Sequence, residues 1–157
     1  MIKYKHLEGR QWDPPKFDCY SALQDFYRDN FEIALRDYAR PDNWWDHGLN
    51  LYMDNFHREG FQVIHEDRLQ DLRVADILLM QIQAPVADHA AIYLGNGWIF
   101  HHFFGRLSNA EQLRPLWWNT RVVTIRHPAV NISETVTDFN LVDDPRIRAK
   151  LDRWKHS

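Results

Sequence analysis

The residues with the clearest chemical potential are one cysteine and a small set of histidines. Cys19 is the single cysteine of the chain and follows Asp18, a typical N-cap for a helix that begins there. A helix N-terminus carries about half a positive charge, and such a position lowers the pKa of a thiol. We therefore expect Cys19 to be a candidate nucleophile, against the alternative that a lone cysteine is a small buried hydrophobic residue.

Three histidines are candidates for the base that takes the Cys19 proton or for the residue that orients this base. His89 opens a candidate strand, and His101 and His102 lie on the strand that follows the turn residues 95–97 (GNG). Paired side chains of an antiparallel hairpin share a face, so the turn decides which histidine meets His89. If the last two turn residues alone form the loop, His102 shares that face; if all three do, His101 lies diagonally next to His89. Turn propensity alone favours the two-residue loop.

A nucleophile, a base and an orienting group form the minimal set for covalent catalysis. Cys19 would attack a carbonyl carbon, His89 would take the thiol proton, and the second histidine would fix the tautomer of His89. The backbone N–H of Cys19 could donate to a developing oxyanion. Cysteine and histidine side chains could instead bind zinc. No Cys-x-x-Cys or His-Glu-x-x-His spacing supports a metal site, and we expect no metal or cofactor.

Hydrophobic spacing places these residues on helices that come first and strands that follow. The helical period predicts helices over 18–30, 43–58 and 144–155, and the period of two predicts strands over 61–64, 76–83, 88–94, 98–104 and 120–126. This order predicts an α+β fold with N-terminal helices packed on an antiparallel sheet meander. We expect one domain over residues 1–128 and a C-terminal extension, 129–157, that carries the short terminal helix.

Composition excludes several classes of protein. The chain has 157 residues, enough for one domain, with 19 Lys and Arg against 22 Asp and Glu. This balance argues against a general nucleic-acid binder. No apolar run approaches the roughly 18 residues of a membrane span, so stable membrane insertion is not expected. The first residues show no apolar core of a signal peptide. We therefore expect synthesis in the cytoplasm, and an extracytoplasmic role would need another route out.

These motifs resemble the NlpC-type cysteine peptidases, papain-like enzymes that cut the stem peptides of bacterial cell wall. The resemblance covers residues 6–127 and rests on segments 18–21 (DCYS), 76–79 (DILL) and 89–97 (HAAIYLGNG) and on His101. The family places a polar third residue twelve positions after its histidine, which is His101 when counted from His89. The resemblance therefore implies a papain-like fold, the catalytic set Cys19, His89 and His101, and the three-residue loop.

The chain is more similar to the tail-assembly branch of this family, found in lambda-type phages, than to the free-standing enzymes. That likeness rests on segments 18–21 (DCYS), 25–27 (DFY), 44–45 (WW), 78–82 (LLMQI) and 101–102 (HH). It implies a tail-tip protein, made in the host cytoplasm, that acts at the cell wall or in the periplasm. The implied partners are the peptidoglycan stem peptide and other tail-tip proteins, and the virion supplies the route out.

The sequence also departs from the family pattern. The family commonly has a tyrosine near the oxyanion, where this chain has Trp12, and a glycine where it has Ala75. Trp12, the exposed aromatics and the terminal helix motivate an alternative function, a catalytically silent plug or adaptor in the tail tip. An amidase or acyltransferase with the same three residues is a further reading. The tryptophan pairs 44–45 and 117–118 could stack on sugars, although such pairs more often divide between core and surface.

Overall fold

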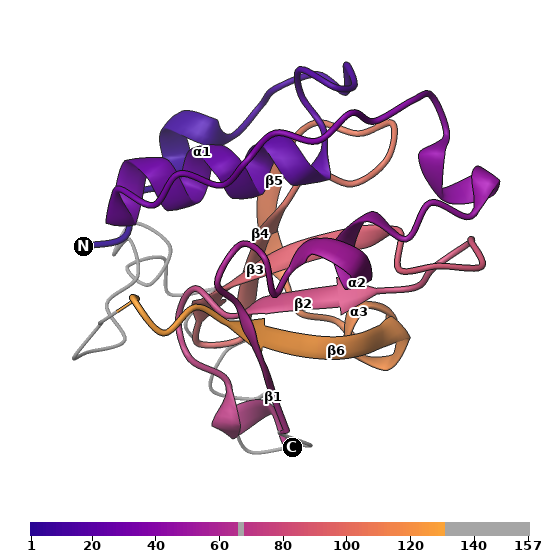
Figure 1. The fold of residues 1–157 in the computed structure, drawn as a ribbon. Helices are drawn as coiled ribbons and strands as arrows, with labels where there is room; N and C mark the ends of the chain where they lie inside the picture. Colours follow the sequence, from indigo (N-terminus) through magenta and orange to yellow (C-terminus); the bar gives the residue numbers. More distant parts are fainter. Residues whose placement is uncertain (66–67, 131–157) are drawn as a thin grey trace.

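A bent antiparallel sheet and one long helix organise the computed structural model, which describes residues 1–65 and 68–130. The six strands lie in the order β1-β6-β2-β3-β4-β5 (Figure 1). Their bounds are β1 Gln62–Ile64, β2 Ile77–Met80, β3 His89–Gly95, β4 Trp98–His101, β5 Asn109–Gln112 and β6 Arg121–Arg126. Every paired neighbour is antiparallel. The predicted α+β class is confirmed.

The predicted meander covers only part of the sheet. Strands β2 to β5 follow one another as neighbours, as expected. The last strand, β6, returns to pair with β2 on the other side and carries β1 at its far edge. The strand β5 was not predicted, because its sequence NAEQ is polar and all four of its residues are only partly buried, which leaves no alternating pattern to detect.

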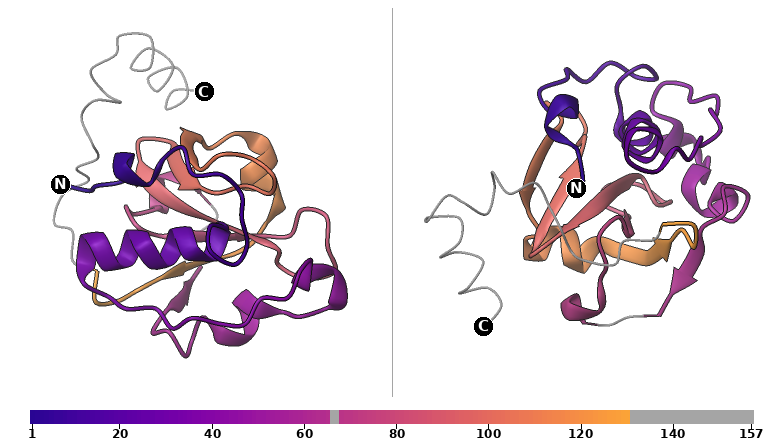
Figure 2. Two further views of the ribbon diagram at one scale, coloured as in Figure 1. Left: turned by 90° about the horizontal axis from the view of Figure 1, so that it is seen from above. Right: turned by 90° about the vertical axis from the view of Figure 1, so that its left-hand side faces the viewer.

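The helix α1 (Cys19–Phe31) begins where the sequence predicts. Asp18 accepts a hydrogen bond from the Ser21 backbone N–H (2.8 Å), and the Ser21 hydroxyl accepts one from the Asp18 backbone N–H (2.8 Å). This reciprocal capping box pairs two backbone donors that would otherwise be left free. The apolar face of α1 then packs on β3 and β4. Figure 2 shows α1 lying on one side of the strands. The start of the helix, and with it Cys19, is therefore firmly positioned.

Both faces of the central strand β2 are buried. Ile77 and Leu79 belong to the core beneath α1, whereas Leu78 and Met80 belong to a second core on the opposite face. Trp117, on the short helix α3 (Pro115–Thr120), fills that second core. The sequence did not predict α3. Short 3₁₀-helices η1 (Lys5–Leu7) and η3 (Leu69–Asp71) complete the connections.

The predicted helix over 43–58 is wrong. It is divided into a 3₁₀-helix, η2 (Trp44–His47), and a short helix, α2 (Leu51–Asn55). Gly48 lies between them with φ of 75°, a left-handed conformation that ends a helix and that glycine adopts readily. The apolar spacing that predicted one helix is only partly kept, since Tyr52 and Phe56 are buried but Leu49 is exposed.

The β3–β4 hairpin combines the two registers that the sequence left open. Gly95 pairs with Trp98, so the loop contains two residues, as turn propensity predicts. A β-bulge between Tyr93 and Gly95 then shifts the register, and Ala91 pairs with His101. An extra residue in one strand moves every later side chain of that strand by one position. His101 consequently lies on the His89 face, as the three-residue loop predicted.

Two predictions concern parts of the chain that the structure leaves open. The terminal helix over 144–155, and nearly all of the extension 129–157, lie outside the described residues. Among the helices in residues 1–65 and 68–130, none is both long and apolar enough to cross a bilayer.

Candidate active site

Cys19 lies at the first position of α1, with its side chain directed toward a tyrosine of a distant element. Its Sγ is 2.8 Å from the hydroxyl of Tyr52 on α2, and the residue is only 3% exposed. Burial raises the pKa of the thiol to about 12, and the neighbouring Asp18 carboxylate adds to the shift. Hydrogen bonding from Tyr52 and the positive charge of Arg40 oppose it. The expected lowering of the thiol pKa by the helix N-terminus is therefore wrong, because desolvation outweighs the dipole.

This raised pKa predicts a slow and strongly pH-dependent reaction of the free protein with iodoacetamide. Only the thiolate reacts, so a pKa of about 12 instead of the ordinary 9.0 leaves about 10³-fold less thiolate at pH 7. We expect the alkylation rate of Cys19 to rise tenfold per pH unit from pH 7 to beyond pH 10. Stopped-flow or mass-spectrometric rates would show this, with a free cysteine peptide as the reference. A plateau below pH 9 would contradict the raised pKa.

A buried ion pair holds Asp18, the residue before Cys19. Arg40 Nε donates to Asp18 Oδ2 at 2.7 Å, and Arg40 also donates to the backbone oxygens of Pro15 (2.6 Å) and Tyr38 (2.9 Å). Arg40 was not predicted from the sequence, because it lies in an irregular segment 22 positions from Asp18. The pair ties this segment to the cap of α1 and so fixes the place of Cys19.

Removing Arg40 is expected to destabilise the fold strongly. The Arg40 side chain is 2% exposed, and R40A leaves the Asp18 carboxylate buried without its cation, which costs about 3–5 kcal/mol in unfolding free energy. Chemical denaturation measures this loss. D37N is the matched control, because Asp37 also pairs with Arg40 but is 77% exposed, and it should change stability by less than about 1 kcal/mol. Equal effects of the two variants would contradict the burial argument.

His89 and His101 form a contacting pair on the face of the sheet opposite α1. His89 Nε2 lies 2.8 Å from His101 Nδ1, and both rings are buried. Burial lowers the pKa of His89 well below 6.5, and the neighbouring His101 lowers it further. His89 is therefore neutral near pH 7 and able to accept a proton. His102 lies elsewhere, with its Nε2 donating to the Arg106 carbonyl at 2.8 Å.

Cys19 and His89 line the same cleft, which has a volume of about 360 Å³. Trp12, Trp45 and Phe104 form part of its wall, and Phe104 contacts both tryptophan rings edge-on. In the described part of the chain no hydrogen bond joins the thiol to His89. The thiol is hydrogen-bonded to the Tyr52 hydroxyl, and Nε2 of His89 is hydrogen-bonded to His101. The His89 ring nitrogen that does not face His101 is Nδ1.

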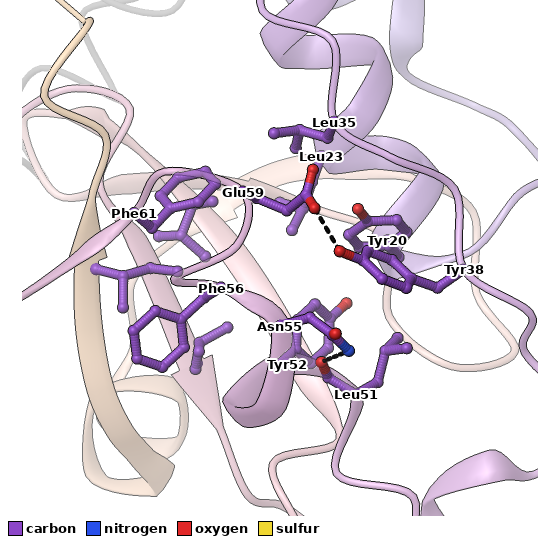
Figure 3. A pocket seen from close by; sticks show the side chains of 13 residues that line it. Tyr20, Leu23, Leu35, Tyr38, Leu51, Tyr52, Asn55, Phe56, Glu59 and Phe61 are labelled. Carbon is purple, nitrogen blue, oxygen red and sulfur yellow. Dashed lines mark hydrogen bonds between the residues drawn. The ribbon is translucent and has the colours of Figure 1, made fainter.

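A second cavity, shown in Figure 3, lies behind Tyr52 and does not suit a substrate. Its volume is about 20 Å³, close to that of one water molecule. A hydrogen bond from Tyr38 to Glu59 lies across its wall, and Asn55 donates to the Leu51 carbonyl at 2.7 Å beside it. Cys19 lines the larger cleft and not this cavity.

The hydroxyl nearest the thiol comes from an unexpected element. Trp12, which replaces the tyrosine of the family pattern, lines the cleft and packs on His102 with ring centroids 5.3 Å apart. The phenol at Cys19 belongs instead to Tyr52. Tyr52 was not predicted as a site residue, because its apolar spacing indicates only a core residue. In residues 1–65 and 68–130, no group of three or more His, Cys, Asp or Glu side chains is placed to hold a metal ion.

The sequence of this site agrees with a known family. Residues 3–127 match the model of the NlpC/P60 family. The chain belongs to the NlpC/P60 family. The predicted resemblance to NlpC-type proteins, and the NlpC-type α+β fold that it implied, are thereby confirmed. Cys19, His89 and His101 all lie inside the matched region.

Two curated relatives of this NlpC/P60 chain come from long-tailed phages. Tail tip assembly protein K of Escherichia phage lambda is 33% identical over 135 residues, which cover 86% of this chain and 66% of that protein. Tail tip assembly protein K of Escherichia phage N15 is 28% identical over 123 residues, covering 75% and 48%. The chain thus spans less than two thirds of either relative.

A solved structure is similar at a lower level. It is a Staphylococcus aureus protein described as similar to a lipoprotein of the NLP/P60 family, with 20% sequence identity and a TM-score of 0.49. The match covers 77% of this NlpC/P60 chain and 37% of the other.

Proposed function

We propose that this chain is a thiol endopeptidase of a phage tail tip, with Cys19 as nucleophile, His89 as general base and His101 as the residue that orients His89. The observation that carries the proposal is the 2.8 Å contact from His89 to His101, with His89 and Cys19 on the wall of one cleft. Membership of the NlpC/P60 family supports it, as does the match to tail tip assembly proteins.

The mechanism starts from an uncharged thiol and an uncharged imidazole. As Cys19 Sγ bonds to the amide carbon, His89 takes the thiol proton, so that no free thiolate is needed. The carbonyl oxygen becomes an oxyanion, which the backbone N–H of Cys19 can stabilise. His89 then gives its proton to the leaving amine. Water adds to the thioester, losing a proton to His89, and the acid is released as Cys19 regains its proton.

The proposed substrate is the stem peptide of peptidoglycan, near the bond between D-glutamate and diaminopimelate. The cleft of about 360 Å³ is of a size that holds a short peptide segment. A tail protein is the alternative substrate. We place the protein in the virion tail tip, next to other tail proteins, after synthesis in the host cytoplasm. Its action would then fall at the cell wall or in the periplasm.

Digestion of purified peptidoglycan tests this function. The wild-type protein should produce fragments whose masses show hydrolysis of a stem-peptide amide and a new free amine. Purified tail-tip proteins, incubated in parallel, show by their masses whether they are cut instead. If neither wall nor tail proteins change, the peptidase proposal is wrong.

One observation favours a second function, a silent plug or adaptor in the tail tip. The thiol is buried, protonated and bonded to Tyr52, as a purely structural cysteine would be. A plug would leave all substrates intact while remaining bound to its tail neighbours. The digestion therefore separates the two functions directly.

A further inference from the structure

A carboxylate stands behind the histidine pair, on the strand next to His101. Glu111 lies on β5, where it pairs with Ile99, so its side chain is a diagonal neighbour of His101 on the same face. Glu111 Oε2 is 3.1 Å from His101 Nε2. The contact is off the line of an ideal hydrogen bond, and it still places a negative charge directly against that nitrogen. No motif in the sequence marked Glu111.

The other oxygen of this carboxylate is fully engaged. Trp117 Nε1 donates to Glu111 Oε1 at 2.9 Å, and Arg114 Nη2 donates to the same oxygen at 2.8 Å. Burial disfavours the charge, but the contact with His101 and the hydrogen bonds from Trp117 and Arg114 outweigh it and hold the Glu111 pKa at about 2. Glu111 is therefore an acceptor only, at every pH of interest.

We propose that Glu111 sets the tautomer of His89 through His101 and thereby leaves Nδ1 of His89 bare for the Cys19 proton. A lone pair on His101 Nε2 would face the carboxylate, so that nitrogen carries the hydrogen. With one hydrogen on each ring, His101 then accepts at Nδ1. His89 consequently donates from Nε2 across the 2.8 Å contact, and its hydrogen cannot be on Nδ1.

The fixed donors on Glu111 make this role specific to a carboxylate. In E111Q the side chain has one acceptor oxygen. Trp117 and Arg114 both donate to the Oε1 position, so the oxygen is held there. The amide NH₂ is then forced toward His101 Nε2, which must accept. Asn109, whose Nδ2 is 3.4 Å from Oε2, can turn its amide oxygen toward the new donor. His101 then carries its hydrogen on Nδ1 and donates it to Nε2 of His89. His89 therefore carries its own hydrogen on Nδ1, the nitrogen that has to accept the Cys19 proton.

Nitrogen NMR of protein labelled with ¹⁵N-histidine tests the tautomer without any substrate. Two-bond nitrogen–hydrogen correlations distinguish a protonated from a bare ring nitrogen, and H89A and H101A spectra assign the rings. Wild type should show His89 protonated at Nε2 and bare at Nδ1. E111Q should show the reverse. E8Q is the matched control, because Glu8 contacts the same strand at Ala110, and its spectrum should equal that of wild type.

Several results would overturn the proposal. The first is a wild-type spectrum in which His89 is protonated at Nδ1. The second is an E111Q spectrum that shows the wild-type tautomer of His89. The third is an E8Q spectrum that shows His89 protonated at Nδ1. If E111Q fails to fold, the wild-type spectrum alone still decides. The catalytic consequence rests on the proposed peptidase function. There we expect E111Q to lower kcat by about 10- to 100-fold, as loss of an orienting partner does elsewhere, with KM little changed. If the NMR spectra show the expected tautomers but the protein hydrolyses no substrate, the peptidase proposal is wrong. The role of Glu111 in setting the His89 tautomer is then still supported.

Discussion

Replacing Cys19 with alanine is expected to abolish amide hydrolysis by this chain. Loss of the nucleophile removes the covalent pathway, and in a comparable peptidase triad it costs roughly 10⁶-fold in kcat. Cys19 and His89 both line the cleft, and the chain has no other thiol to replace Cys19. The measurement is the rate of stem-peptide release from purified peptidoglycan, followed by mass spectrometry.

The fold of this variant should remain intact, which makes the loss interpretable. The capping box of Asp18 and Ser21 holds the start of α1 without the thiol. C19A removes one buried sulfur and its contact with Tyr52, so a small loss of stability, about 1 kcal/mol, is expected. Thermal unfolding checks this. A C19A protein that cuts as fast as wild type would show that the chemistry lies elsewhere.

Replacing His101 with alanine should remove most of the activity, whereas replacing His102 should not. H101A deletes the ring that accepts from His89 Nε2, and loss of such an orienting group costs about 10²- to 10⁴-fold in kcat. His102 is buried and adjacent in sequence, which makes H102A a closely matched control. It loses a hydrogen bond to the Arg106 carbonyl, worth about 1 kcal/mol of stability, and its packing on Trp12, but it keeps the contact between His89 and His101.

The comparison of these two variants depends on the bulge in the β3–β4 hairpin. Without the shift between Tyr93 and Gly95, His102 would share the face of His89. Hydrolysis rates measured at saturating substrate separate the two variants. Loss of activity in H102A together with normal activity in H101A would mean that the hairpin has the other register.

The start of α1 and the strands around the histidines could be predicted from sequence, because their signals are local. A capping residue lies next to the helix that it caps, and the turn 95–97 lies between the strands that it joins. The bulge is different. Turn propensity identified the two-residue loop correctly but could not show the shift that follows it, and only the family spacing from His89 to His101 indicated the right partner.

The remaining features of the site depend on contacts between distant segments. Tyr52, Arg40 and Glu111 reach the site from α2, an irregular segment and β5, and no local pattern distinguishes them from core or surface residues. The pKa of the Cys19 thiol likewise depends on contacts that the local sequence does not show. Position at a helix start predicts a lowered pKa, but the burial that raises it arises from side chains packed around Cys19 from other elements.

Covalent labelling of Cys19 by a substrate mimic tests the central claim most directly. The probe is a short stem peptide with a vinyl sulfone in place of the scissile amide, because it must bind in the cleft before the sulfur reacts. Intact mass and peptide mapping give the site and rate of labelling in wild type and in H89A. We predict labelling at Cys19 in wild type that slows by at least about tenfold in H89A, since the general base is lost. Equal rates in the two proteins, or no labelling of Cys19, would contradict a nucleophile served by His89.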